Sequence, residues 1–441
     1  MRKLFLFTMM TLILASQSFS QSPKIEFTEY DLSNGLHVIL HQDNSLPIVA
    51  VTTTFHVGSK NEDPKRTGFA HFFEHLMFEG SDNIKRGEID NIIQNAGGQL
   101  NASTSFDETK YYFILPSNQL ELGLWIESER MLHAKVDSTG VETQRSVVKE
   151  ERRQSIDNRP YGSMFEQVFS HSFSVHPYRW TPIGSFQYID QATIEEFRDF
   201  YHTYYVPNNA VLSISGDIDI AKTKQLIDAY YSAIPKGTRP MLRPTEVEPV
   251  KTAEVRDSIF DNIQLPAVIQ AYHIPAQTDK DYYAIAMLTN LLSEGQSSRL
   301  YKALVDDKKV AVYSGSFPMT LENPGLFIVY SVAAFGKSAA DNETAMDVEI
   351  SKVQKELISD EEFQKLRNQV ESDIVKGKNK QVGIAYSLAE NYLFFGNTNL
   401  INTEIEGYMA VTKEDLKHAA QQYFNKENRT ILYYLPKAKK N

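Results

Sequence analysis

Three residues in one short apolar stretch have the types and spacing of a metal site. His71, Glu74 and His75 lie within the segment AHFFEHLMF. Residues four apart share one face of an α-helix, so the two imidazoles can bind the same ion. Zinc accepts two imidazoles and a carboxylate and keeps a fourth position for water, whose pKa it lowers towards about 7. A neighbouring carboxylate can then accept the proton, and Glu74 is the candidate general base.

The arrangement H-x-x-E-H is the inverted form of the H-E-x-x-H motif of zinc peptidases. A five-residue match leaves two interpretations open, because polar residues also occur by chance on helices that pack against a core. Two imidazoles need a third protein ligand to complete a catalytic zinc site. The positions of the surrounding elements must therefore decide between the two interpretations.

An internal repeat bears on this choice. The segment from Leu46 resembles the segment from Leu265, since both run Leu-Pro, strand, polar turn, helix and then Glu-Gly. Aligning the two Glu-Gly pairs places Ala286, Thr289 and Asn290 opposite the three polar residues. The second copy of the helix forms without them, and this favours a chemical over a structural role.

The flanking elements follow from hydrophobic periodicity and turn residues. The patterns predict three strands within residues 24–59, helices at 68–80 and 85–98, strand character at 99–116, and helices at 118–132, 141–158 and 193–205. Three prolines and little periodicity predict a linker at 236–250. It separates an N-terminal metal-bearing domain, residues 21–235, from a C-terminal homologous domain, residues 251–441.

The N-terminus and the composition indicate an exported protein. Arg2 and Lys3 precede an apolar run, and Ser18 and Ser20 precede a predicted cleavage before Gln21, so residues 1–20 read as a signal peptide. The apolar run is too short to span a bilayer, which argues against stable membrane insertion. The absence of cysteine favours a periplasmic or secreted location. A net charge of −11 without a Lys/Arg block argues against nucleic acid as a partner.

The motif and its surroundings resemble the pitrilysin/insulinase family of zinc metallopeptidases, in its short processing-peptidase-like branch. In that family a glutamate ligand lies on a helix about 75 residues after the motif. The segment TQRSVVKEERRQSIDNRPYG carries Glu150 and Glu151 at this distance. The resemblance implies one Zn²⁺ per chain with Glu151 as third ligand and Glu150 as the fallback, since helical neighbours point about 100° apart. Gln144 is a departure, because some relatives carry a glutamate there.

The resemblance also implies a strand that binds the substrate. The segment LNASTSFDETKYYF is similar to the family's Asn-Ala-x-Thr strand, with Asn101, Ala102 and Thr104 at the matching positions. An edge strand offers unpaired backbone groups, so it can hold an extended polypeptide by β-addition. An ordinary sheet strand remains the alternative for this segment.

A second departure concerns the C-terminal half. Active single-chain relatives place an arginine seven residues before a tyrosine, and both stabilise the oxyanion of the substrate. Tyr313 matches the tyrosine, but Asp306 stands where the arginine belongs. Lys308, Lys309 or Arg299 are substitutes to consider. The resemblance implies a homologous partner subunit that supplies an Arg/Tyr pair, with a self-sufficient homodimer as the rival.

The fold implied by the resemblance is α+β. Two homologous halves, each a mostly antiparallel sheet packed with helices, form a clamshell around a cavity. The implied activity is a zinc-dependent endopeptidase that cleaves short or unfolded polypeptides. The alternative is a non-catalytic assembly or peptide-binding subunit that keeps the peptidase fold.

Overall fold

The computed structural model describes residues 24–378 and 380–438, so the expected signal peptide lies outside the described residues. The first half contains strands β1 (Thr28–Asp31), β2 (His37–Gln42), β3 (Ile48–Phe55), β4 (Gln99–Thr104), β5 (Thr109–Pro116) and β6 (Ala210–Gly216), and helices α1 (Phe69–Leu76), α2 (Glu88–Asn95), α3 (Leu120–His133), α4 (Ser138–Arg152), α5 (Met164–Ser172), α6 (Phe186–Gln191), α7 (Ile194–Tyr204) and α8 (Ile220–Tyr231). The second half contains strands β7 (Val255–Asp261), β8 (Ala267–Ile274), β9 (Ala311–Met319), β10 (Gly325–Ala333) and β11 (Arg429–Pro436), and helices α9 (Tyr282–Ser293), α10 (Ala339–Lys355), α11 (Asp360–Gly377), α12 (Gln381–Phe395), α13 (Leu400–Ala410) and α14 (Lys413–Tyr423).

The second sheet repeats the arrangement of five of the six strands of the first, which agrees with the repeat and confirms the predicted α+β fold. The first sheet has the order β1-β2-β6-β3-β5-β4, and the second has the order β7-β11-β8-β10-β9. Each sheet is antiparallel except for one parallel pair, β2 with β6 and β7 with β11. Strand β4 therefore corresponds to β9, both at an edge, and α1 corresponds to α9.

Burial patterns explain the positions of the strands. Strand β3 is buried along almost its whole length, as expected for a strand between β5 and β6 with both faces covered. Strand β5 alternates between buried and partly buried residues, while β4 alternates between exposed and partly buried residues. This second pattern is typical of an edge strand with one face packed on a core. Helices α1, α3 and α7 supply much of that core.

The two halves exchange a helix. Helix α5, which follows α4, packs on β8 and β11 of the second sheet, and Phe169 is fully buried there. Helix α12, which follows α11, packs on β3 and β6 of the first sheet, where Leu388 is fully buried. The exchanged helices occupy equivalent places, since β3 corresponds to β8 and β6 to β11. Neither sheet can bury this face without the other half.

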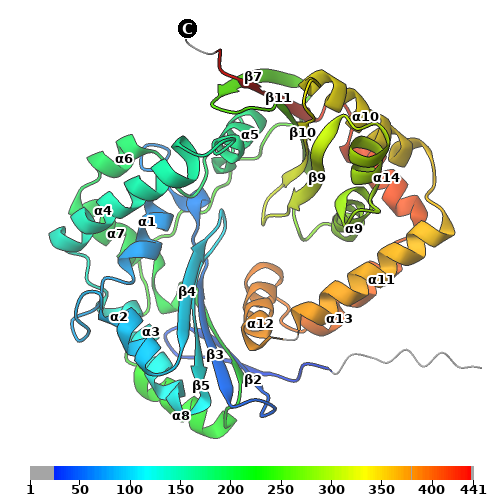
Figure 1. Cartoon of the computed structure of the whole chain (residues 1–441). Coiled ribbons are helices and arrows are strands. Elements are labelled where there is room, and N and C mark those ends of the chain that lie inside the picture. The colour runs from blue at the N-terminus through cyan, green and yellow to red at the C-terminus, as the bar shows by residue number, and fades with distance from the viewer. Residues whose placement is uncertain (1–23, 379, 439–441) are drawn as a thin grey trace, which may run out of the picture.

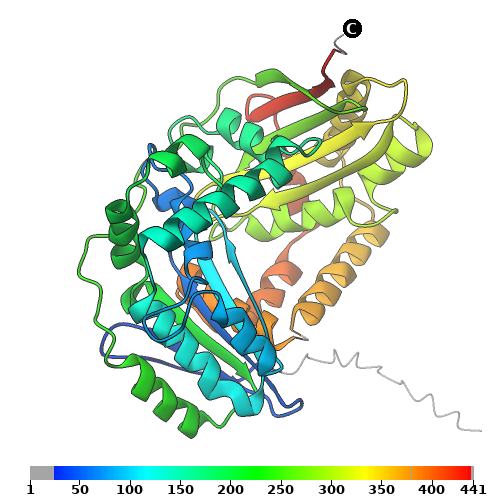
Figure 2. The ribbon, with the colours of Figure 1, turned by 60° about the vertical axis from the view of Figure 1, so that its left-hand side comes forward.

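In Figure 1 the first sheet with its helices and the second sheet with α9, α10 and α14 lie on opposite sides of the molecule, and α11 and α13 lead back to α12, which packs on the first sheet. Figure 2 shows the same two layered halves from the side of α4. In residues 24–378 and 380–438, no helix combines the length and the apolarity needed to cross a membrane.

Candidate metal centre

Helix α1 presents its polar residues on one side and its apolar residues on the other. His71, Glu74 and His75 are partly exposed. The opposite face is buried and consists of Phe69, Ala70, Phe72, Phe73 and Leu76. The helix therefore needs no polar residue for packing, and its apolar spacing alone fixes which side faces the site.

The start of α1 is fixed by a glycine and a buried carboxylate. Gly68 has φ +101°, and an added Cβ would lie 3.1 Å from the carbonyl oxygen of Ile183, so the position requires glycine. The carboxylate of Glu62 accepts hydrogen bonds from the backbone N–H groups of Gly68 at 2.9 Å and Ala70 at 2.8 Å. These bonds satisfy donors that the helix leaves free at its N-terminus.

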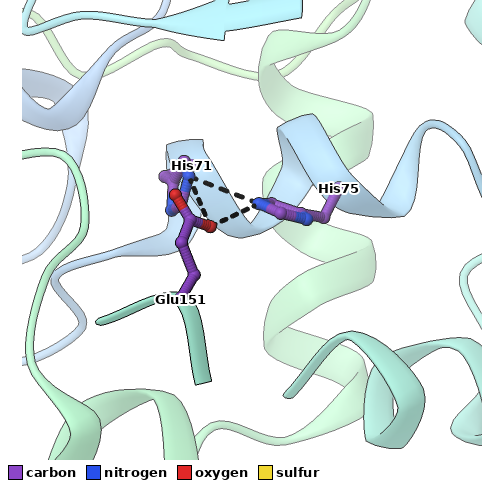
Figure 3. A group of neighbouring side chains, drawn as sticks. All are labelled: His71, His75 and Glu151. Atoms are coloured by element: carbon purple, nitrogen blue, oxygen red, sulfur yellow. Dashed lines mark hydrogen bonds and ion pairs between the residues drawn. The ribbon is translucent and has the colours of Figure 1, made fainter. Parts of the chain in front are cut away.

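Helix α4 brings a carboxylate to the two imidazoles. The Oε2 atom of Glu151 lies 3.1 Å from Nε2 of His75 and 3.5 Å from Nε2 of His71, and the two Nε2 atoms are 3.3 Å apart (Figure 3). Glu150 points elsewhere, because its carboxylate accepts hydrogen bonds from Gln154 at 2.9 Å and Arg153 at 3.2 Å. Of the two candidates left by the sequence, only Glu151 is close to the imidazoles.

The three ligand atoms have the separations that a tetrahedral ion requires. Metal–ligand distances of about 2.0–2.1 Å at tetrahedral angles imply ligand atoms about 3.3 Å apart. The distances of 3.1, 3.3 and 3.5 Å centre on that value. In the described part of the chain, no other set of three His, Cys, Asp or Glu side chains converges in this way. Two imidazoles and one carboxylate also form the donor set of a catalytic zinc site, so the residues fit the ion.

The electrostatics favour neutral imidazole at His71. Burial, followed by the charge of His75, lowers the pKa of His71 to about 4, although the carboxylate of Glu151 acts in the opposite direction. A neutral ring keeps a lone pair on Nε2 for a metal. The Nδ1 atom of His71 is buried without a hydrogen-bond partner in the described part of the chain.

Glu74 lies beside the three ligand atoms and contacts the edge strand. The hydroxyl of Thr104 donates a hydrogen bond of 2.6 Å to Oε2 of Glu74. Burial raises the pKa of Glu74 above its ordinary value, although the Thr104 hydrogen bond and the charge of His75 lower it. The structure thus joins a candidate base on α1 directly to one of the positions expected to bind the substrate.

Strand β4 is the free edge of the first sheet. It pairs with β5 in register, with Asn101 opposite Tyr112 and Thr104 opposite Thr109. Ala102 and Thr104 face the helical layer and are partly buried, whereas Asn101 faces the other side and is exposed. The backbone groups of β4 that face away from β5 are therefore free to pair with an added strand, which is the geometry of β-addition.

In the described part of the chain, no hydrogen bond or ion pair joins the residues predicted in the second half to the metal centre. Tyr313 lies on edge strand β9, is half exposed, and packs its ring 5.6 Å from that of Tyr330. Asp306 lies in a π-helical segment, Tyr301–Asp307. Arg299 is held by Glu362 through hydrogen bonds of 3.0 and 2.9 Å.

A polar network links α1 to α4, and sequence reasoning missed it. The guanidinium of Arg86 forms ion pairs with Glu79, just after α1, and with Asp137 at 2.8 Å. Asp137 is the N-cap of α4 and accepts a hydrogen bond from the backbone of Gly140 at 2.8 Å. Gln144 donates to Glu79 at 2.6 Å rather than to a ligand histidine. The network fixes the two ligand-bearing helices against each other, and its only signal in the sequence is the N-capping aspartate.

Comparison with known proteins gives consistent results. A family model described as "Insulinase (Peptidase family M16)" matches residues 37–181, and one described as "Peptidase M16 inactive domain" matches residues 191–370. The zinc protease PqqE of Helicobacter pylori is 29% identical over 441 residues, which cover 99% of this chain and 98% of that protein.

Solved structures agree on the fold. The crystal structure of a protease from Helicobacter pylori is similar with a TM-score of 0.90 and 28% identity, covering 93% of this chain and 100% of that one. The periplasmic protease PqqL from Escherichia coli is similar with a TM-score of 0.76 and 20% identity, covering 94% of this chain but 48% of that one. The solved PqqL chain is therefore about twice as long as the part of it that matches this chain.

Proposed function

Because the chain belongs to the insulinase family of zinc metallopeptidases, we propose that it is a zinc-dependent endopeptidase whose metal ligands are His71, His75 and Glu151. One observation carries the proposal: two imidazole nitrogens and one carboxylate oxygen converge at 3.1–3.5 Å, with Glu74 beside them. Zinc bound there supplies Lewis-acid activation of a water molecule and of the substrate carbonyl.

The chain's own residues carry the remaining chemistry. Glu74 accepts the proton of the attacking water and then delivers it to the leaving amine, and its carboxylate is held beside the three ligands by the hydrogen bond from Thr104. Strand β4 binds the substrate through its free backbone groups at Asn101, Ala102 and Thr104. Backbone pairing requires an extended chain, so the substrates are short or unfolded polypeptides.

Among the described residues, no arginine of the C-terminal half forms a hydrogen bond or ion pair with the residues of the metal centre. Tyr313 is exposed on β9, Arg299 is engaged with Glu362, and Asp306 has the wrong charge. We therefore propose that a homologous partner subunit supplies an Arg/Tyr pair to this metal centre. The fold of PqqL supports a paired arrangement, since this chain matches 93% of that protein's separately solved first half. Export after cleavage near Ser20 completes the proposal and places the enzyme in the periplasm or outside the cell.

A non-catalytic subunit is the second candidate, because one matching family model is described as an inactive domain. That model matches residues 191–370, whereas His71, Glu74, His75 and Glu151 lie within the part matched by the insulinase model. The match to an inactive domain therefore concerns the second half and leaves the peptidase proposal as the stronger one.

The substitution Glu74→Gln tests the proposal. It keeps the shape of the side chain and the three ligands, so the variant should bind zinc normally while hydrolysis of a quenched fluorescent peptide falls by at least about 100-fold. Glu142→Gln, at an exposed carboxylate of α4, serves as the control and should leave hydrolysis unchanged. Retained turnover in Glu74→Gln would reject Glu74 as the base.

The partner is tested by assaying the chain alone and with a homologue that bears the Arg/Tyr pair. We expect little hydrolysis by the chain alone and recovery when the homologue is added. Full activity of the purified chain, together with a dimer mass by light scattering, would contradict the heterodimer and establish the homodimer.

A further inference from the structure

A network of charges joins the second half of the chain to the turn that follows the proposed substrate strand. This turn, residues 105–108, links β4 to β5 and begins directly after Thr104, whose hydroxyl donates a hydrogen bond to Glu74. Its backbone lies on the segment after β3, where the N–H groups of Ser59 and Lys60 donate to two carbonyl oxygens of the turn at 3.2 and 3.0 Å. The turn therefore fixes where the end of β4 lies relative to α1.

The carboxylate of Asp107, in the middle of this turn, is buried and binds donors from both halves. Its Oδ1 atom accepts a hydrogen bond from the hydroxyl of Tyr178 at 2.6 Å and lies 2.8 Å from Nζ of Lys60. Its Oδ2 atom accepts a hydrogen bond of 2.9 Å from the backbone N–H of Glu322, which belongs to the turn between β9 and β10. The second half is thus bonded directly to the turn that follows β4.

The side chain of Glu322 extends the network back into the first half. Its Oε2 atom lies 2.7 Å from Nε2 of His56, just after β3, and forms an ion pair with Lys60. Burial raises the pKa of Glu322, but the hydrogen bond with His56 and the charge of Lys60 outweigh it and lower that pKa to about 2. The side chain of Lys60 is 2% exposed, so its ammonium depends on nearby anions, and Glu322 and Asp107 hold it between the two turns.

Other contacts already hold the two halves together. The exchanged helices α5 and α12 bury Phe169 and Leu388 against the opposite sheets. The side chain of Glu322 is partly exposed, and ion pairs of partly solvated groups add little to stability. When Glu322 is removed, Lys60 is left with its ion pair to Asp107, so the turn can shift while the apolar interface remains. The effect of Glu322 is therefore expected on the position of the turn rather than on the fold.

We propose that Glu322 is a positioning residue for peptide hydrolysis. Through Lys60 and Asp107 it fixes the turn after β4, and the fixed turn keeps the hydroxyl of Thr104 hydrogen-bonded to Glu74. The inference rests on the proposed peptidase function and gives a role in it to the half without the metal-binding motif. Displacements near a reacting group are costly, since a misplacement of about 1 Å lowers the rate by about 100-fold.

A double-mutant cycle tests whether Glu322 acts through Thr104. Hydrolysis of a quenched fluorescent peptide is measured for the full-length, zinc-loaded protein, for Glu322→Ala, for Thr104→Val and for the double variant, with the homologous partner present if the wild type needs it. Glu322→Ala should lower kcat about 10-fold, and KM should change by less than about threefold because β4 stays paired with β5. The double variant should lie within about twofold of Thr104→Val, because the effect of Glu322 is transmitted by that hydroxyl.

Hydrogen–deuterium exchange adds a readout that needs no turnover. Backbone amides within residues 104–108 should exchange at least about fivefold faster in Glu322→Ala than in the wild type. Glu406→Ala, at an exposed carboxylate of α13 in the same half, is the control and should change neither exchange nor kcat. Thermal unfolding identifies a variant that fails to fold, and Glu322→Gln, which removes the charge and keeps the shape, then takes the place of Glu322→Ala.

An unchanged kcat, additive effects in the cycle, or unchanged exchange in the turn overturns the positioning role. Absence of hydrolysis by the wild-type protein, with the exchange response of the turn intact, would instead refute only the peptidase function.

Discussion

The assignment of Glu151 as the third metal ligand can be tested by replacing a carboxylate with an amide at each of two adjacent positions. Glu151→Gln replaces a carboxylate that lies 3.1 and 3.5 Å from the two imidazole nitrogens. Glu150→Gln makes the same change one residue earlier, where the carboxylate is exposed and bonded to Arg153 and Gln154. Both variants lose one negative charge from α4, so any difference between them comes from contact with the ion.

The expected magnitude follows from the geometry. Loss of a group that only supports a zinc ligand lowers metal affinity about 10–100-fold. Glu151 faces the ion position directly, so its replacement should cost at least the upper end of that range, about 100-fold or ~2.7 kcal/mol. Its side chain is 41% exposed, so the amide remains hydrated and the metal-free protein should keep its melting temperature.

Competition with a chromophoric chelator measures the zinc affinity of each variant, and elemental analysis gives the metal content. We expect Glu150→Gln to bind within about twofold of the wild type, since an exposed charge interacts weakly with the ion. Equal affinities for all three proteins would refute the assignment of a third ligand on α4. A loss confined to Glu150→Gln would show that the register of α4 is wrong.

Two further predictions concern the elements around the site. Leu388→Ala, at a fully buried position of α12, should lower the free energy of unfolding of both halves together by about 2–5 kcal/mol, as measured by calorimetry. Leu357→Ala, at an exposed position, is the control and should change that free energy little. Separate unfolding transitions of the two halves would contradict the exchange of helices. Arg86→Met should weaken zinc binding about tenfold in chelator competition by uncoupling α1 from α4, and unchanged affinity would show that packing alone positions the helices.

The local part of the site could be predicted from the sequence because its geometry is helical. The i, i+4 spacing of His71 and His75 fixes both on one face of any helix that forms there, and the apolar residues between them fix which face is buried. The choice between Glu150 and Glu151 needed the register of α4 against α1, which depends on tertiary packing. The structure places Glu151 beside the imidazoles. Because adjacent helical residues point about 100° apart, Glu150 cannot face the same ion.

The contacts between the two halves have no sequence pattern comparable with the i, i+4 spacing of the two histidines. The sequence of α12 is apolar on several sides, which indicates a buried helix but not which sheet covers it. Its packing on β3 and β6 joins residues far apart in the chain. The contacts of Lys110 have the same character, since it pairs with the nearby Glu108 and also with Glu390, which lies 280 residues later in the chain. Charges that meet only after folding have no spacing to detect.

The second half provides an internal comparison for the metal centre. Helices α9 and α11 correspond to α1 and α4, and both contribute to the lining of a pocket of about 270 Å³. Ala286, Thr289 and Asn290 line it from α9, and Asp373 lines it from α11. The second half thus forms the equivalent pair of helices with Ala286, Thr289 and Asn290 in place of the motif residues, and imidazoles occur only in the first half. Since packing requires neither histidine, their presence together with Glu151 in the first half supports selection for metal chemistry at that site alone.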